Sequence, residues 1–286
     1  MKNILNPITL LFCISVFFVE CSDSNKMEAV STDNKDTIVA VEEVELIKEK
    51  LIYFDGADTL IGYLFYNSDI VNKPGILVVH EWWGNNDYAQ SRAEMLANLG
   101  YVAFAIDMYG NGLVVDNPDD AKIASGKIYS NPELLKSRMM AARETLIKTN
   151  KANSEKIAAI GYCFGGNVVL NAANAGVPLN TVVSFHGGLG GFKAQNNILY
   201  SQVLVCNGAA DNFVSPEDIK NFKSEMDRVE APYTFIEYAD ATHAFTNPNS
   251  TAVGEKFGMP IAYNEVADNK SWQDMLIFFD THFSID

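Results

Sequence analysis

The sequence predicts an α/β fold with a mainly parallel central sheet, helices on both faces and an antiparallel hairpin at its N-terminal side. Short apolar runs such as residues 75–80 and 102–107 are typical of strands buried on both faces of a sheet. These runs alternate with segments of helical periodicity, which favours parallel strands covered by helices. Asp55-Gly56 separates two further strand-like stretches and predicts a hairpin turn.

The first half of the predicted domain contains the hairpin, two buried strands and three helices. Apolar spacing of three and four residues predicts the helices, and Gly100 is placed to end the first of them. The strands are expected at residues 44–53, 59–66, 75–80 and 102–107, and the helices at residues 88–99, 119–129 and 132–149.

The second half continues the alternation of strand and helix. Ser215 is predicted to cap the helix that follows it, because Asp218 stands at the spacing of a capping box. The last helix is amphipathic and is expected to close the domain. The strands are expected at residues 157–162, 181–185, 202–207 and 233–238, and the helices at residues 166–175, 216–229 and 271–283.

Composition restricts the possible partners. The 286 residues suffice for one large α/β domain, and a net charge of −15 gives no support to a nucleic-acid partner. Four cysteines occur, none in a metal-binding spacing, so we expect no metal and no cofactor. Cys163 and Cys206 are not expected to form a disulfide, because the fold places a strand between theirs.

The N-terminal segment has the pattern of an export signal. Lys2 precedes an apolar run at residues 8–19, which is too short to span a membrane and typical of a signal-peptide core. Cys21 follows at the position of a lipoprotein's lipid acceptor, although Glu20 replaces the usual small residue. We therefore expect an exported protein, periplasmic or membrane-anchored through lipid at Cys21. Plain secretion and an uncleaved anchor remain the alternatives.

These signals divide the chain into three parts. Residues 1–20 are predicted to be the signal peptide, and the polar, acidic residues 21–42 a flexible tether. Residues 43–286 are predicted to form the catalytic domain.

The chemistry centres on a glycine-rich turn at residues 161–166, which reads Gly-Tyr-Cys-Phe-Gly-Gly. An apolar strand precedes it and an apolar helix follows, which is the pattern of a nucleophile elbow with Cys163 at its tip. The glycines allow strand and helix to approach closely, and the helix N-terminus favours a thiolate. The alternative is an inert cysteine buried at a strand end.

Two further candidate catalytic side chains follow predicted strands later in the sequence. Asp211 comes just after the strand at 202–207, and His243 just after the strand at 233–238. Nucleophile, acid and histidine is the chain order of α/β-hydrolases, and all three should meet at the carboxyl edge of the sheet. His80 and His186 also end strands but precede Asp211, so we interpret them as structural groups in the floor of the site.

In these motifs the chain resembles the dienelactone hydrolase family of α/β-hydrolases, over about residues 44–283. The matching stretches are His80-Glu81-Trp82-Trp83-Gly84, Asp107-Met108-Tyr109-Gly110, Gly161-Tyr162-Cys163-Phe164-Gly165-Gly166, His186-Gly187, Gly208-Ala209-Ala210-Asp211, Thr242-His243-Ala244-Phe245, Tyr263-Asn264 and Trp272.

The resemblance implies roles for these residues. Cys163 would be the nucleophile, His243 the base and acid, and Asp211 the residue that orients His243. Glu81 would contact the resting thiol and help to activate it when substrate arrives. The backbone N–H groups of Phe164 and Trp82 would form the oxyanion hole.

The chain departs from the family's dienelactone-cleaving members in one respect. Those members hold a substrate carboxylate with arginines near the tyrosine loop and after the histidine. The loops here contain no arginine, and the only four are Arg92, Arg138, Arg143 and Arg228, all in predicted helices. Trp83, Tyr109 and Phe245 instead indicate an aromatic pocket for an uncharged group.

We therefore interpret the sequence as an exported ester or lactone hydrolase that acts on a small molecule through a thioester. One alternative is a non-catalytic small-molecule binding protein on a hydrolase fold. Another is a thiol-redox protein, although no resolving cysteine lies nearby in the sequence.

Overall fold

The computed structural model describes residues 45–196 and 198–283 of the 286-residue chain. The predicted signal peptide, Cys21 and the tether lie outside these residues. No helix within the described part has the length and apolar character needed to cross a membrane.

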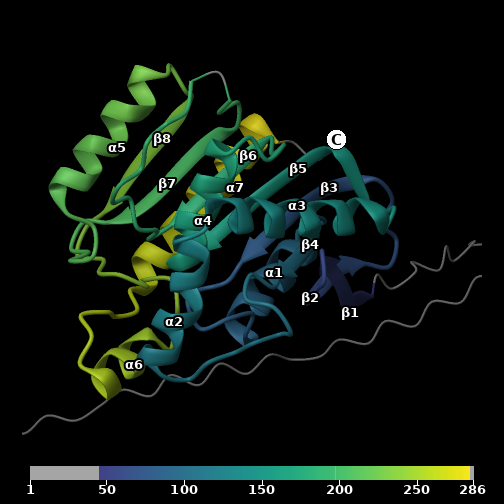
Figure 1. The fold of residues 1–286 in the computed structure, drawn as a ribbon, viewed down its shortest axis with the longest axis horizontal. Coiled ribbons are helices and arrows are strands. Elements are labelled where there is room, and N and C mark those ends of the chain that lie inside the picture. The colour runs from purple at the N-terminus through teal and green to yellow at the C-terminus, as the bar shows by residue number, and fades with distance from the viewer. Residues whose placement is uncertain (1–44, 197, 284–286) are drawn as a thin grey trace, which may run out of the picture. The chain divides into compact units, whose positions relative to one another are not determined.

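The core of the fold is a single eight-stranded sheet with the order β1-β2-β4-β3-β5-β6-β7-β8 (Figure 1). The β1–β2 and β2–β4 pairs are antiparallel, and every other pair is parallel. The hairpin therefore extends one side of a parallel sheet, as the sequence predicts. The strands are β1 (Leu46–Asp55), β2 (Asp58–Asn67), β3 (Lys73–Val79), β4 (Val102–Ile106), β5 (Ala152–Tyr162), β6 (Thr181–Phe185), β7 (Gln202–Gly208) and β8 (Tyr233–Tyr238).

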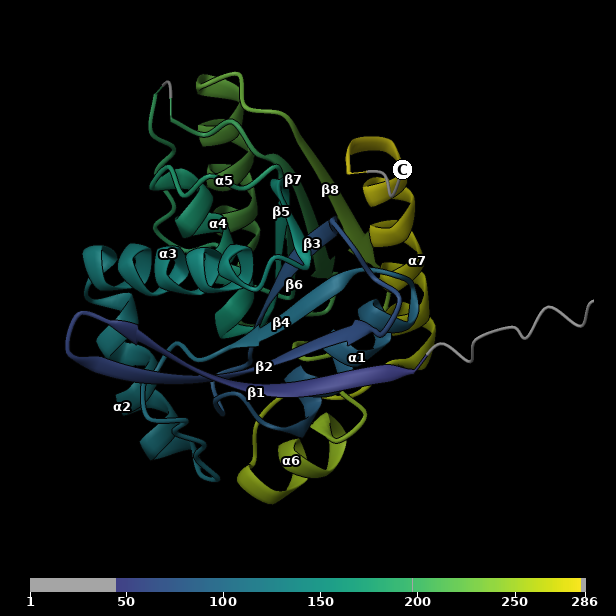
Figure 2. The ribbon, with the colours of Figure 1, turned by 90° about the vertical axis from the view of Figure 1, so that its right-hand side faces the viewer.

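Helices cover both faces of the sheet, and Figure 2 shows α3, α4 and α5 on one side and α7 on the other. Each face has its own apolar core. Side chains of α3 and α4 fill one core, and side chains of α1 and α7 fill the other. The helices are α1 (Asp87–Asn98), α2 (Pro118–Tyr129), α3 (Pro132–Lys148), α4 (Phe164–Asn174), α5 (Pro216–Arg228), α6 (Ser250–Phe257) and α7 (Glu265–His282).

The strands and helices occur in the predicted order, with three differences at their ends and connections. β5 begins at Ala152, because a short polar stretch pairs with β3 before a bulge that the apolar pattern does not reveal. α7 begins at Glu265, where the Asn264 side chain accepts the N–H of Ala267 as an N-cap. α6 was not predicted from the sequence, although Gly258 ends it in the left-handed conformation of a C-cap.

Other local predictions are confirmed. Ser215 and Asp218 form the reciprocal capping box at the start of α5. Cys163 and Cys206 are both free thiols, and β6 lies between the strands that precede or contain them.

The carboxyl ends of the parallel strands lie level with one another, which brings the loops after them together. Val79 of β3 pairs with Gly161 of β5, and Phe185 of β6 pairs with Cys206 of β7. The loops after β3, β5, β7 and β8 contain Glu81, Cys163, Asp211 and His243 respectively. This edge of the sheet is therefore where a ligand is expected to bind.

The turn from β5 to α4 is close-packed enough to require glycine. A Cβ on Gly161 would lie 2.0 Å from the carbonyl oxygen of Gly165, and a Cβ on Gly165 would lie 2.3 Å from the carbonyl oxygen of Val79. Both contacts are with backbone atoms, which cannot rotate away. This confirms the prediction from the sequence that the glycines allow strand and helix to pack closely.

Substituting two helical glycines should therefore have opposite effects. Gly165→Ala should lower the free energy of unfolding by more than about 2 kcal/mol, because its methyl group meets the β3 backbone. Gly126→Ala in α2, where an added Cβ meets nothing within 4 Å, should raise it by about 0.5–1 kcal/mol. Urea unfolding of both variants measures the difference. Equal effects of the two changes would contradict this packing account.

Candidate active site

Cys163 stands at the tip of the β5–α4 turn in a strained backbone conformation. Its φ is 53° and its ψ is −111°, a combination that residues with a Cβ rarely adopt. The Cys163 N–H lies 3.0 Å from the Phe185 carbonyl oxygen and 3.0 Å from Nδ1 of His186, so two groups on β6 and the loop after it hold the turn. The sulfur sits at the N-cap of α4, where the helix dipole favours negative charge.

His243 links Cys163 to Asp211. Its Nε2 lies 3.0 Å from the sulfur of Cys163, and its Nδ1 lies 2.8 Å from Oδ2 of Asp211. The other carboxylate oxygen of Asp211 accepts the N–H of Phe213 at 2.8 Å. Sulfur, imidazole and carboxylate therefore form one hydrogen-bonded chain, contributed by the loops after β5, β7 and β8.

The surroundings of His243 favour its protonated form. Burial of the ring opposes the charge, but the Cys163 sulfur and the Asp211 carboxylate together raise the pKa of His243 to about 10. The Asp211 side chain is completely buried, so water screens its charge little. At neutral pH the imidazolium form of His243 is therefore favoured, with the Cys163 sulfur beside it.

His80 and His186 are buried neighbours of this chain and have structural partners, as the sequence suggests. The Nε2 atom of His80 accepts the N–H of Met108 at 3.4 Å. Burial lowers the pKa of His80 to about 4 and holds that of His186 well below its usual value. His186 therefore stays neutral, accepts the Cys163 N–H at Nδ1 and uses Nε2 to bond Thr246 Oγ1 at 2.7 Å.

Glu81 lies in the same cavity but bonds a residue that the sequence did not single out. Its Oε2 accepts a hydrogen bond from Nδ2 of Asn247 at 2.6 Å. Glu81 and Cys163 line the same cavity, but no hydrogen bond joins the two side chains among the described residues. Burial raises the pKa of Glu81 to about 7, against the smaller opposing effect of Asn247. The carboxyl group can therefore exchange its proton near neutral pH.

Phe164 and Trp82, whose N–H groups the sequence assigns to the oxyanion hole, line the same cavity as Cys163. Phe164 is the first residue of α4, so its N–H has no acceptor within the helix. Trp82 lies in the loop after β3, and its carbonyl oxygen accepts the hydroxyl of Tyr109 at 2.9 Å. Tyr109 thus holds the Trp82 loop in place rather than lining the cavity.

A cavity of about 200 Å³ opens over the sulfur, and its lining is mostly apolar. Trp83 lines it, as the sequence predicts, whereas Phe245 is fully buried and packs against His186 in the core. Several lining residues were not predicted from the sequence, because they come from a helix end, a loop and α6 with its connection. These are Tyr129, Phe213, Ala244, Met259 and Ile261.

No lysine or arginine from the described residues lines this cavity. All four arginines lie in helices and have other partners, as the sequence indicates. Arg92 is buried and pairs with Asp268 at 2.7 Å. A substrate carboxylate would therefore find no lysine or arginine partner in this cavity. Across residues 45–283 apart from 197, no cluster of three or more histidine, cysteine or acidic side chains is arranged to hold a metal.

Comparison with known proteins shows the family of the chain. The family model described as "Dienelactone hydrolase family" matches residues 60–283. The chain belongs to the dienelactone hydrolase family. Membership identifies it as a hydrolase and confirms the fold predicted from the sequence. A putative carboxymethylenebutenolidase of Aquifex aeolicus is 26% identical over 222 residues, which cover 73% of this chain and 88% of that relative.

Solved structures of this family are also similar. One named m3DLH is 32% identical with a TM-score of 0.79, and the match covers 84% of this chain and 99% of that one. A dienelactone hydrolase-like promiscuous phosphotriesterase, P91, from metagenomic libraries is 33% identical with a TM-score of 0.77, at the same coverage. Esterase 2 of Thermogutta terrifontis, at 17% identity and a TM-score of 0.55, shares the fold.

The raised pKa of Glu81 predicts a measurable effect on stability. A carboxyl group whose pKa rises from 4.5 to about 7 on folding binds its proton more tightly in the folded state. Stability is therefore lost as the pH rises from about 4.5 to 7. Glu81→Gln removes this loss, so the variant should gain on the order of 2–3 kcal/mol over the wild type between pH 4.5 and 8. Urea unfolding across this pH range provides the measurement.

Glu94→Gln on the exposed face of α1 is the matched control. It should follow the wild type at every pH. A difference between Glu81→Gln and the wild type that stays constant with pH would show that the Glu81 carboxyl group is not desolvated.

Proposed function

We propose that the protein hydrolyses uncharged carboxylic esters or lactones, with Cys163 as nucleophile. The observation that supports this most directly is the chain from the Cys163 sulfur through His243 to Asp211, with contacts of 3.0 and 2.8 Å. Cys163 lines a cavity together with Phe164 and Trp82, whose N–H groups we assign to the oxyanion hole. These are the parts that acyl transfer requires: nucleophile, base with an orienting acid, and donors for an oxyanion.

The proposed reaction proceeds in two halves. The thiolate of Cys163 attacks the substrate carbonyl carbon, and the N–H groups of Phe164 and Trp82 stabilise the oxyanion that forms. His243 donates its Nε2 proton to the departing alcohol oxygen as the carbon–oxygen bond breaks, which leaves a thioester. His243 then removes a proton from water, the hydroxide adds to the thioester, and the carboxylic acid departs as the thiolate re-forms.

We propose that Glu81 does not act as a nucleophile, and that its carboxyl group changes protonation state when substrate binds. It is buried beside the cavity, and Asn247 holds its Oε2. With a pKa of about 7, it can take up or release a proton when a ligand displaces water. Family resemblance suggests that this change helps to activate Cys163. The apolar lining and the absence of lysine and arginine among the described lining residues support an uncharged substrate group in this cavity.

Replacing the nucleophile tests the proposal. Cys163→Ala should lower the turnover of 4-nitrophenyl acetate by about four orders of magnitude or more, because no other group can form the acyl intermediate. Release of nitrophenolate by purified protein is the measurement.

Cys206→Ala is the control, since Cys206 is a buried thiol whose sulfur accepts the Tyr238 hydroxyl. It should keep turnover within about threefold of the wild type. Unchanged turnover in Cys163→Ala would refute the mechanism. Wild-type protein whose thiol is labelled in full but which turns over no ester would favour a binding protein instead.

We also propose that the enzyme is exported and held at a membrane through lipid on Cys21, with the domain beyond the tether. The support is the sequence alone: an apolar run at residues 8–19, a cysteine immediately after it, and a polar segment before the domain. Anchoring of this kind would leave small-molecule substrates accessible to the domain.

Substituting the acceptor tests the anchor. Cys21→Ser should move the protein from the membrane fraction to the soluble fraction of cells, because the hydroxyl cannot take the place of the thiol in lipid attachment. Immunoblots of fractionated cells measure the distribution, with Cys13→Ser as the control. Retention of Cys21→Ser in membranes would favour an uncleaved anchor, and wild-type protein in the soluble fraction would favour plain secretion.

A further inference from the structure

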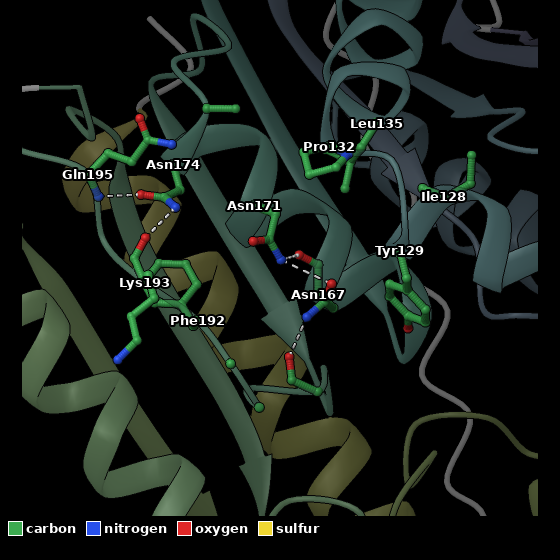
Figure 3. A pocket seen from close by; sticks show the side chains of 14 residues that line it. Ile128, Tyr129, Pro132, Leu135, Asn167, Asn171, Asn174, Phe192, Lys193 and Gln195 are labelled. Atoms are coloured by element: carbon green, nitrogen blue, oxygen red, sulfur yellow. Dashed lines mark hydrogen bonds between the residues drawn. The ribbon is translucent and has the colours of Figure 1, made fainter.

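A second cavity of about 530 Å³ lies beside the catalytic one and has a different lining (Figure 3). One face of α4 forms its floor, the end of α2 and the start of α3 form one wall, and the loop after β6 forms the other. The residues that define these three sides are Asn171 of α4, Tyr129 at the end of α2 with Pro132 at the start of α3, and Phe192 and Gln195 of the loop.

The two cavities adjoin. Tyr129 and Gly188 line both of them. Cys163 caps the helix whose next turn contributes Asn167 to the second cavity. A group bound at the sulfur can therefore extend past Tyr129 along α4 without leaving the protein surface.

The α4 floor presents amide groups on an otherwise apolar helix. Asn167, Asn171 and Asn174 are spaced by four and three residues, which places them on one helix face. Asparagine is a poor helix former, and three of them within the 11 residues of α4 disfavour the helix intrinsically. The outer two have clear structural roles, but the middle one does not.

The outer asparagines fix the loop that forms one wall. Asn167 Nδ2 donates to the Gly188 carbonyl oxygen at 2.8 Å. Asn174 donates to the Lys193 carbonyl oxygen at 2.8 Å and accepts the Gln195 N–H at 2.7 Å. Both bonds of Asn174 appear in Figure 3. The cavity is therefore held open by side-chain bonds and does not depend on a ligand to form.

Asn171 is positioned differently. Its Nδ2 donates to Oδ1 of Asn167 at 3.0 Å and to the Asn167 carbonyl oxygen at 2.9 Å (Figure 3). Its own Oδ1 accepts no hydrogen bond from the described residues, and the side chain is half-buried at the cavity floor. Asn167 therefore orients the Asn171 amide, and Oδ1 of Asn171 remains an acceptor available at the cavity lining.

The character of the lining selects for neutral, hydroxyl-bearing groups. Lys193 is the single charged side chain that lines the cavity within the described part, and Glu225 already lies 3.5 Å from its ammonium group. An apolar chain would cover Oδ1 of Asn171 without replacing its hydrogen bond to water. Hydroxyl groups both donate and accept, as amides do, and the half-exposed ring of Tyr129 offers a flat apolar face.

We propose that this cavity is a second substrate subsite that binds a hydroxyl-rich, uncharged part of the ester, such as a sugar or polyol unit. The inference rests on the proposed hydrolase function and names its substrate class: esters or lactones with a compact apolar part and a polyhydroxylated part. Eight residues of helix separate Cys163 from Asn171, about 12 Å, so a unit about the size of a hexose is needed to bridge them.

Two pairs of esters, matched in size, test this subsite. Ethyl gluconate and ethyl hexanoate vary the acyl side, and 6-O-acetylglucose and cyclohexylmethyl acetate vary the alcohol side. The measurement is the ratio of kcat/KM within each pair, divided by the ratio of alkaline hydrolysis rates. In at least one pair the wild type should favour the hydroxylated ester by about tenfold or more.

Substitution of Asn171 links that preference to the cavity. Asn171→Leu replaces the amide by an apolar group of similar size, and Asn171→Ala removes it, and both residues favour a helix. Each variant should lower the preference at least about fivefold. Asn98→Ala, at an exposed position in α1, is the control and should retain it.

Turnover of 4-nitrophenyl acetate by the same preparations separates the two proposals. If that ester is hydrolysed with dependence on Cys163 but neither matched pair shows a preference, the subsite is refuted and the hydrolase stands. A preference that both Asn171 variants retain would also refute the subsite. Failure to hydrolyse any ester would refute the proposed function itself.

Discussion

The site depends on the strained backbone of Cys163 and on the contacts that hold it. A φ of 53° would relax if the turn were free, but the Cys163 N–H is shared between Phe185 and His186 on one side. On the other side, Gly165 presses against the backbone of β3 with no room for a Cβ. The sheet and the helix together therefore determine the position of the Cys163 sulfur. The loops that carry His243 and Asp211 then place these side chains within hydrogen-bond distance of it and of each other.

The hydrogen bonds that hold the Cys163 turn also require His186 to be neutral. A protonated His186 could not accept the Cys163 N–H at Nδ1, so burial that keeps the ring neutral also keeps the turn in place. His243, one ring away at 5.4 Å, has the opposite charge preference because Asp211 and Cys163 surround it. Burial of His186 and the partners of His243 thus give two neighbouring imidazoles different protonation states.

The fold and the hydrogen-bonded series from Cys163 through His243 to Asp211 could be predicted from the sequence, because local residue patterns indicate both. Buried strands appear as apolar runs, and residues just past their ends must share one edge of a parallel sheet. Gly161 and Gly165 mark the close turn directly. The family resemblance supplied Glu81, Phe164 and Trp82, which no local pattern would distinguish from ordinary loop residues.

What the sequence left undetected depends on packing between distant segments. Asn247 bonds Glu81 across 166 positions, and nothing near either residue indicates that pairing. Phe245 lies two residues after His243, and the sequence predicts it in the cavity. Ala244 between them adopts the left-handed conformation, with a φ of 57°, and the turn leaves the Phe245 side chain in the core. α6 was not predicted because its eight residues, which include Gly254, are too few to show a helical hydrophobic periodicity.

α6 and the connection after it have a consequence for how such an enzyme can diversify. Ile261 pairs with the backbone of His243, and Phe257 of α6 stacks on Trp83 with ring centroids 6.2 Å apart, so this segment forms a wall of the cavity over Cys163. Yet it supplies none of the sulfur, imidazole or carboxylate groups, which all come from loops directly after strands. Mutation, insertion or exchange of residues 250–261 could therefore reshape what fits over the sulfur while the reactive groups stay fixed, which would let descendants of one ancestor acquire new substrates without rebuilding the chemistry.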